Sequence, residues 1–293
     1  MIDFFKPASI QQAIEILAQV PGATCLAGGT DLVVGLRAGA LHPDAVVDLG
    51  GLGLDAIDIL ADEVRIGATV TMSRLAELSD TVPQLGLLAE AASTVGAWQI
   101  QNRATIGGNI CNASPAADAV CALLALDAEV EITAAAGARR MALEKFLKGP
   151  GKTSLQNGEI LSAVFVPGSE DTNPVYASYR KQGTRNAMVI ALASLAGFTQ
   201  IRGGRVRRCS LALGSVAPTC IRARSAESFL LGKELTNDVV VQAVELARSD
   251  ASPIDDARAS ASYRSDLVAA LVTEHLLAAR EALHDESTRG AAS

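Results

Sequence analysis

Two short glycine-rich segments constrain the fold of this chain more than any other feature. Residues 27–31 (Ala-Gly-Gly-Thr-Asp) follow a short apolar, strand-like run, residues 105–109 (Thr-Ile-Gly-Gly-Asn) follow an irregular stretch, and a helical pattern comes after each. Glycine lets backbone N–H groups approach an anion closely and adopts conformations that other residues avoid. With their hydroxyl, carboxylate and amide side chains, the two segments together predict a pyrophosphate held from both sides.

Each segment by itself permits a simpler interpretation. Residues 27–31 could be a glycine turn that joins a strand to a helix without any ligand. They match neither the G-x-G-x-x-G dinucleotide pattern nor the phosphate loop G-x-x-x-x-G-K-[ST]. Asp118, in an otherwise apolar helical run, also has two interpretations. Its carboxylate suits two ribose hydroxyls, and it equally suits a first helical turn, where the helix dipole favours an acid.

The apolar periodicity predicts an α+β chain whose first part alternates helices and strands. A polar, proline-containing stretch, residues 167–174, predicts the boundary between two domains. We expect helices and strands in the first part at residues 9–19, 24–27, 32–36, 45–49, 64–68, 73–79, 84–96, 115–126, 129–132 and 159–166.

The second part predicts an antiparallel sheet covered by helices. Residues 189–201 and 206–214 read as two strands, and Arg-Gly-Gly between them is typical of a hairpin because glycine supplies positive φ. Helical patterns follow at residues 223–231, 237–249 and 262–284. The expected domains are 1–173, with subdomains of about 1–55 and 56–173, then 174–284 and a frayed tail, 285–293.

At this point the chain resembles a known family. Residues 27–32, 99–110 and 114–118, together with 214–219 and 256–264, are similar to the FAD-binding medium subunits of molybdenum hydroxylases, the xanthine dehydrogenase and carbon monoxide dehydrogenase family. The resemblance covers nearly the whole chain. It implies a two-subdomain, PCMH-type (vanillyl-alcohol-oxidase-like) FAD-binding domain followed by a C-terminal flavoprotein domain.

The resemblance also implies which residues contact FAD. Two segments would wrap the pyrophosphate, Asp118 would lie near the adenosine ribose, Leu161 would pack on the flavin, and Lys181 would lie at the isoalloxazine. Lys181 could otherwise be a solvated surface lysine. If glycine leaves room for phosphate, Gly28→Val and Gly107→Val should both abolish FAD retention. The pyrophosphate residues would be Cys25, Leu26, Ala27, Gly28, Gly29, Thr30, Asp31, Leu32, Thr105, Ile106, Gly107, Gly108 and Asn109.

The family further implies partners. Electrons would leave the substrate at a molybdenum-pterin centre in a large subunit, cross [2Fe-2S] clusters in a small subunit, and reach this chain's FAD before a terminal acceptor. A dimer of heterotrimers is expected. Residues 186–188 (Asn-Ala-Met) lack the acid that some members carry near the nicotinamide path, which puts NAD use in doubt. Thr30 and Asp31 replace a His-Ser pair of carbon monoxide dehydrogenases, which favours an N-heterocycle or an aldehyde as substrate.

Composition excludes other function classes. A net charge of −7 with one short arginine-rich run, residues 202–208, argues against a nucleic-acid partner. We expect a cytoplasmic protein because the chain has neither a membrane-length apolar run nor a signal-peptide pattern. Five scattered cysteines without a C-x-x-C pair, and three histidines, argue against a metal or cluster site, including the [4Fe–4S] loop of hydroxybenzoyl-CoA reductases.

Two other functions remain open from the sequence. A self-sufficient vanillyl-alcohol-oxidase-like flavin oxidoreductase would need its own substrate-binding and proton-transfer residues, and no convincing set is present. A scaffold subunit without FAD would fit the absence of catalytic residues, but the two intact glycine segments argue against it.

Overall fold

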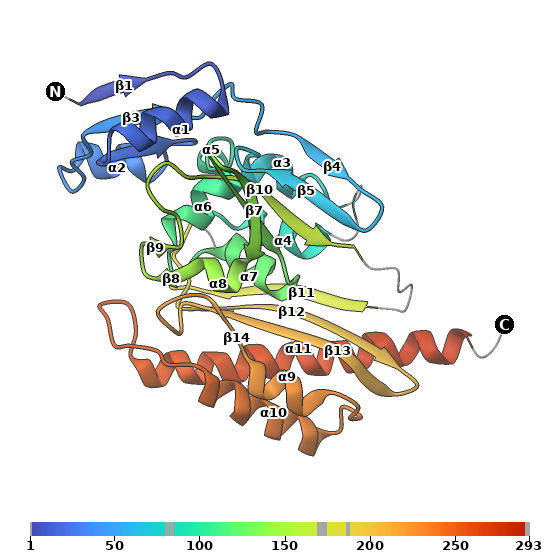
Figure 1. The fold of residues 1–293 in the computed structure, drawn as a ribbon. Coiled ribbons are helices and arrows are strands. Elements are labelled where there is room, and N and C mark those ends of the chain that lie inside the picture. Colours follow the sequence, from blue (N-terminus) through green and yellow to red (C-terminus); the bar gives the residue numbers. More distant parts are fainter. Residues whose placement is uncertain (1, 80–81, 83–84, 169–174, 186–187, 291–293) are drawn as a thin grey trace.

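A computed structural model describes residues 2–79, 82, 85–168, 175–185 and 188–290, and it has the expected α+β fold (Figure 1). A small parallel sheet and a larger antiparallel sheet form the first part. A second antiparallel sheet, backed by three helices, forms the C-terminal part. The predicted boundary between residues 173 and 174 lies outside the described residues.

A three-stranded parallel sheet forms the N-terminal end, in the order β1-β3-β2. The Ser9 side chain caps the first helix, which the sequence predicts at residues 9–19, by accepting a hydrogen bond from the Gln12 amide. The helix then buries Ile14 and Leu17 against Val47 of β3. The elements are β1 (Asp3–Phe5), α1 (Ile10–Gln19), β2 (Ala23–Leu26), α2 (Leu32–Arg37) and β3 (Ala45–Asp48).

A five-stranded antiparallel sheet, ordered β4-β5-β10-β6-β7, follows. Its central strand β10 is fully buried up to Pro167, which explains its continuous apolar sequence. The strands are β4 (Ile57–Ile59), β5 (Glu63–Gly67), β6 (Glu129–Ala134), β7 (Gly137–Ala142) and β10 (Ile160–Pro167). The remaining elements of this part are α3 (Met72–Ala76), α4 (Gly86–Ser93), α5 (Trp98–Gln101), α6 (Ile106–Asn112), α7 (Asp118–Ala125), α8 (Leu143–Phe146), β8 (Leu147–Gly149) and β9 (Lys152–Thr153).

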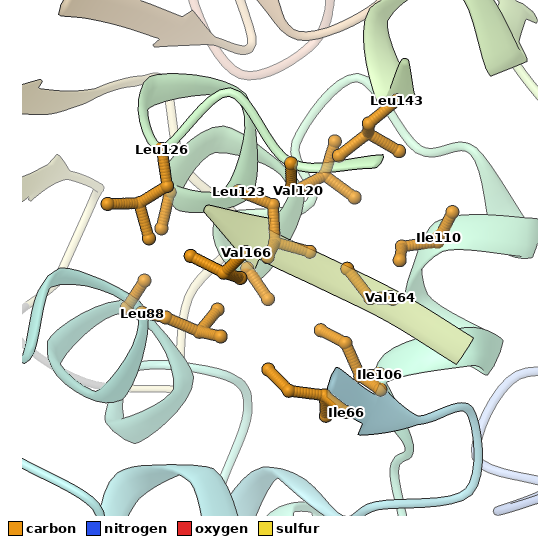
Figure 2. Close-up of a cluster of buried hydrophobic side chains, with 14 of the residues drawn as sticks. Ile66, Leu88, Ile106, Ile110, Val120, Leu123, Leu126, Leu143, Val164 and Val166 are labelled. Carbon is orange, nitrogen blue, oxygen red and sulfur yellow. The ribbon is translucent and has the colours of Figure 1, made fainter. Parts of the chain in front are cut away.

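Helix α7 lies at the centre of the molecule. All of its residues are buried, because it packs on α4 and also contacts β12 and β13 of the C-terminal sheet. A helix that is apolar on every side needs such cover. Figure 2 shows Val120 and Leu123 of α7 with Ile66, Val164 and Leu88 in one cluster. The core therefore continues from the first part of the chain into the second.

The C-terminal sheet has the order β11-β12-β13-β14, and three helices cover the face turned away from α7 (Figure 1). Gly203 and Gly204 turn the β12–β13 hairpin with φ of 58° and 73°, which confirms the predicted turn. The elements are β11 (Val175–Gln182), β12 (Ala193–Arg202), β13 (Arg205–Gly214), β14 (Ile221–Arg222), α9 (Arg224–Leu230), α10 (Asn237–Asp250) and α11 (Ala261–Gly290).

The structure adds strand β11 to the prediction and corrects two predicted boundaries. Strand β11 was not predicted, because its mixed polar sequence shows no clean alternation and only pairing with β12 makes it a strand. Strand β12 begins at Ala193 rather than at residue 189. Helix α11 continues to Gly290, beyond the predicted end at residue 284, because no glycine or proline interrupts residues 262–289.

The buried ring of His275 on α11 predicts a pH dependence of stability. Ring atom Nδ1 lies 2.9 Å from Ser178 Oγ, and Nε2 lies 2.9 Å from Thr199 Oγ1. Burial, with a smaller effect of Arg180, lowers the pKa of His275 from 6.5 to about 3. Below pH 6.5 the unfolded chain therefore binds a proton at His275, whereas the ring stays neutral in the folded chain down to about pH 3. The contribution of His275 to the free energy of unfolding is fully present above pH 6.5 and is lost as pH falls toward 3.

We expect this group to lower the free energy of unfolding by about 1.4 kcal/mol for each pH unit below 6.5. Urea unfolding at several pH values measures this pH dependence. Because other groups also titrate, His275→Gln is the comparison. The free energy of unfolding of the variant should depend less steeply on pH. Parallel slopes in the two proteins would contradict a neutral, buried His275.

Candidate functional site

The first glycine segment lies where the parallel sheet ends. Strand β2 stops at Leu26, the chain turns through Ala27 to Asp31, and α2 begins at Leu32. Gly29 has a φ of 74°, a left-handed conformation that favours glycine. A Cβ on Gly28 would lie 1.9 Å from the Arg103 carbonyl oxygen. Gly28 is thus required for close contact between this turn and the residues just before the second segment.

The turn offers a run of available hydrogen-bond donors. Within the described residues, the backbone N–H groups of Gly28, Gly29, Thr30 and Asp31 have no acceptor in the protein. Consecutive amides of this kind bind anions, phosphate oxygens in particular. The segment can therefore cradle a pyrophosphate, as the sequence predicts.

The second segment has a different arrangement from the one expected. The amides of Ile106, Gly107 and Asn109 donate to Val70 O (2.9 Å), Ala68 O (2.8 Å) and Thr105 O (2.9 Å). The Gly108 amide donates to Thr105 Oγ1 at 3.1 Å. The expectation that its backbone would be free for phosphate is wrong for these four N–H groups. The side chains of the segment, and the Thr105 amide, which has no acceptor within the described part of the chain, remain for contact with a ligand.

The structure also changes the reason why glycine is needed at residues 28 and 107. A Cβ on Gly107 would lie 2.7 Å from the carbonyl oxygen and from the Cβ of Ala68. Protein atoms, rather than phosphate, occupy the space beside Gly28 and Gly107. Valine at either residue would therefore disturb packing as well as cofactor binding, and neither variant tests the cofactor alone.

A cleft of about 250 Å³ lies between the two glycine segments. It includes a third glycine-rich segment, between β3 and β4, that the sequence analysis missed. Gly51 and Gly53 have φ of 84° and 70° and open space around them. Three glycines in residues 50–53, directly after a buried strand, were the available signal. The cleft is lined by Ala27, Gly28, Gly50, Gly51, Gly53, Asp55, Thr69, Thr71, Asn102, Arg103 and Thr105.

The cleft residues fit FAD. Strands β2 and β3 are parallel, so the turns after them meet at the same edge of the sheet, the usual place for a ligand. Nearby on α6, the buried Asn109 Oδ1 has no hydrogen-bond partner in the protein. A buried polar atom normally has one, so a cofactor hydroxyl is a natural partner. Amides, hydroxyls and this amide oxygen are the groups that phosphate and ribose require.

Asp118, at the start of α7, meets two side chains from β11. Its Oδ2 lies 2.6 Å from Lys181 Nζ, and its Oδ1 accepts a hydrogen bond of 2.5 Å from the Tyr179 hydroxyl. Burial raises the pKa of the Asp118 carboxyl, while Lys181 and the hydrogen bonds oppose that shift. Side-chain exposure is 6% for Asp118 and 10% for Lys181, so Lys181 is a buried, paired cation rather than a solvated one.

This ion pair constrains the two predicted roles. The resemblance implies Asp118 at the ribose and Lys181 at the isoalloxazine, yet the two groups touch. An extended FAD cannot place its ribose and its flavin at one point, so the contact between these two groups does not fit two widely separated roles. Leu161 is 3% exposed in the core cluster of β10, and it does not line the cleft.

The C-terminal motifs at residues 214–219 and 256–264 have structural roles. Arg264, buried on α11, donates to Leu192 O at 2.6 Å and to Ser215 O at 3.0 Å, and it pairs with Asp256 at 2.9 Å. The Ser215 amide donates to Pro115 O at 2.8 Å. These contacts join the C-terminal sheet to the segment that precedes Asp118.

The described residues hold no gathering of three His, Cys, Asp or Glu side chains of the kind that binds a metal ion. All five cysteines are free. Burial raises the pKa of the Cys25 thiol to about 11, so it stays protonated at neutral pH. In the same part of the chain, no helix is both long and apolar enough to cross a bilayer.

Comparison with known proteins bears on these functions. Residues 1–169 match the family model described as FAD binding domain in molybdopterin dehydrogenase. The chain belongs to this family. Residues 178–279 match a second model, CO dehydrogenase flavoprotein C-terminal domain. The predicted FAD-binding medium subunit of an oxidoreductase is confirmed, and a scaffold without FAD is disfavoured.

Several relatives match this chain over nearly their whole length. The xanthine dehydrogenase FAD-binding subunit of Escherichia coli O157:H7 is 35% identical over 273 residues, covering 92% of this chain and 93% of the relative. The glyceraldehyde dehydrogenase medium chain of Sulfolobus acidocaldarius is 31% identical, covering 92% and 94%. A chain of CO dehydrogenase from Oligotropha carboxidovorans superposes with a TM-score of 0.89 at 29% identity, covering 96% and 98%.

Proposed function

We propose that this chain binds FAD through the cleft and passes electrons to it from a partner's [2Fe-2S] clusters, while a molybdenum-pterin partner hydroxylates the substrate. The observation that carries the proposal is the run of four unpartnered amides at residues 28–31, beside the cleft. FAD, once bound, accepts and releases the electrons. This chain contributes binding and orientation, with FAD-binding and C-terminal domains meeting between residues 173 and 174.

The residues divide into three proposed tasks. The amides of residues 28–31 hold the pyrophosphate, flanked by Cys25, Leu26, Ala27 and Leu32. Thr105 and Asn109 contact phosphate or ribose oxygens through their side chains, and residues 106–108 shape that wall. The pair of Asp118 and Lys181 faces the flavin end, where a fixed charge affects the reduced ring, and Leu161 supports the same end from the core.

The names of the relatives do not identify one substrate. Their names specify xanthine, glyceraldehyde and carbon monoxide, three unlike molecules, so a shared medium subunit does not select among them. Thr30 and Asp31 favour an N-heterocycle or an aldehyde. We also propose that the enzyme assembles as a dimer of heterotrimers in the cytoplasm and passes its electrons to a terminal acceptor.

Gly51→Ala should weaken FAD binding at least about tenfold. The added methyl group enters open space at the cleft wall, where the cofactor would lie. Gly39→Ala is the matched control: Gly39 has a φ of 65°, similar to the 84° of Gly51, and equally open surroundings, but it is not part of the cleft. Both variants carry a similar backbone strain of roughly 1–2 kcal/mol.

Flavin fluorescence during FAD titration gives the dissociation constant for each variant. Equal loss of affinity in Gly51→Ala and Gly39→Ala would show that strain alone is responsible, and would remove the cleft as the cofactor site.

The electron route has a separate test. Substrate should bleach the flavin of this chain only when the molybdenum and iron-sulfur partners are present, as stopped-flow absorbance would show. Bleaching of the isolated chain by substrate would instead support the self-sufficient flavin oxidoreductase, the second candidate.

A further inference from the structure

Tyr179 belongs to a buried cluster in which both oxygens of one carboxylate have partners. The Tyr179 hydroxyl donates to Asp118 Oδ1 at 2.5 Å, and Lys181 Nζ donates to Asp118 Oδ2 at 2.6 Å and to Thr94 O at 3.1 Å. Tyr179 is 3% exposed. We call these four residues the Asp118 cluster.

The backbone fixes where the Tyr179 hydroxyl lies. Tyr179 and Lys181 are two residues apart on β11, so their side chains point to the same face of the sheet. The Tyr179 amide also donates to Glu90 Oε2 of α4 at 2.7 Å, and the Arg180 guanidinium pairs with Glu90 at 2.9 Å. Strand β11 is thereby held against α4 and the start of α7.

We infer that Tyr179 is a positioning residue: its hydroxyl hydrogen-bonds to Asp118 Oδ1 and leaves Oδ2 for Lys181. It thereby sets how much of the lysine charge beside the flavin the Asp118 carboxylate offsets. The inference rests on the proposed placement of this pair at the flavin end of FAD. A hydrogen-bond donor favours the ionised form of a carboxylate. Without the hydroxyl, Asp118 is neutralised more easily and offsets less of the positive charge beside it.

The other titratable groups around Asp118 do not compete for this role. Burial raises the pKa of Cys121 to about 12 and the pKa of Cys220 well above its usual value, so both thiols stay neutral. Glu90 and Arg180 pair with each other at the edge of the cluster. The charge beside the flavin therefore depends on the Asp118 and Lys181 pair.

The test is a redox titration of the flavin in the assembled enzyme. Lys181→Met should lower the two-electron reduction constant about tenfold, or about 30 mV, and Asp118→Asn should raise it by a similar factor. Tyr179→Phe should raise it as well, by about threefold, because it partly imitates Asp118→Asn. Tyr176→Phe, the same change on the same strand with its ring against His275, should leave the potential unchanged.

The possible results test the role of Tyr179 separately from the proposed placement of the Asp118 and Lys181 pair at the flavin. If Asp118→Asn and Lys181→Met shift the potential and Tyr179→Phe lowers only thermal stability, Tyr179 has a merely structural role and the inference is overturned. If none of the three shifts the potential while FAD content stays at the level of the unmodified enzyme, the pair is not at the flavin, and the proposed placement fails together with the inference.

Discussion

Replacing Asp118 with alanine should lower the free energy of unfolding by about 3–5 kcal/mol. The substitution leaves the Lys181 ammonium, 10% exposed, with the Thr94 carbonyl as its remaining hydrogen-bond partner in the cluster. Removing one member of a buried ion pair is costly because the other charge stays buried without compensation. Urea unfolding of the purified chain, prepared free of FAD, measures the change.

A double variant tests whether the loss of stability comes from the unpaired charge of Lys181. Asp118→Leu combined with Lys181→Met removes both charges, so it should recover much of the lost stability even though the pair is gone. Arg65→Ala provides the surface control, because Arg65 and Asp58 are 28% and 48% exposed and their pair should contribute less than about 1 kcal/mol. A double variant as unstable as Asp118→Ala would contradict this account.

Arg222→Met should be about as destabilising, also by roughly 3–5 kcal/mol. The Arg222 guanidinium is buried and pairs with Glu227 at 2.5 Å and with Asp127 at 2.5 Å. It also donates to Leu124 O at the end of α7 at 2.9 Å and to Ser210 Oγ at 2.7 Å. Methionine fills the space but leaves the carboxylate of Glu227, 6% exposed, with the more distant guanidinium of Arg224, at 3.5 Å, as its cation.

Thermal and urea unfolding of Arg222→Met, compared with Arg222→Met/Glu227→Gln, test the cause. The glutamine removes the buried charge and keeps an acceptor for the Leu211 amide, which donates to Glu227 Oε1 at 2.8 Å. The double variant should therefore be the more stable of the two. A further loss of stability in the double variant would show that the hydrogen bonds of Arg222, rather than the buried charge of Glu227, dominate.

The sequence predicted the elements whose signals are local. The helix at α7 followed from a continuous apolar run, the β12–β13 hairpin from two adjacent glycines, and the first glycine turn from its place between a strand and a helix. Each of these depends on neighbours within a few residues. Such features are visible in one sequence because the conformation and the residues that cause it lie together.

The features that the sequence could not provide depend on distant partners. The amides of residues 106 and 107 are occupied by carbonyls of Val70 and Ala68, which only the folded chain brings near. Asp118 and Lys181 are 63 residues apart, and they meet because β11 pairs at the edge of the C-terminal sheet. Tyr179 carried no signal of its own, since a tyrosine in a polar segment resembles many surface residues.

Helix α7, covered by α4 from the first part of the chain and by the sheet of the second part, restricts how this subunit can be recombined with its relatives. A chimaera that keeps residues 1–168 and takes its C-terminal sheet from another medium subunit must reproduce the side chains of β12 and β13 that face α7, including Ala196 and Ala212. Larger side chains there would overfill a closely packed contact. Exchanges of parts between these enzymes are therefore better made with the whole medium subunit than with half of it.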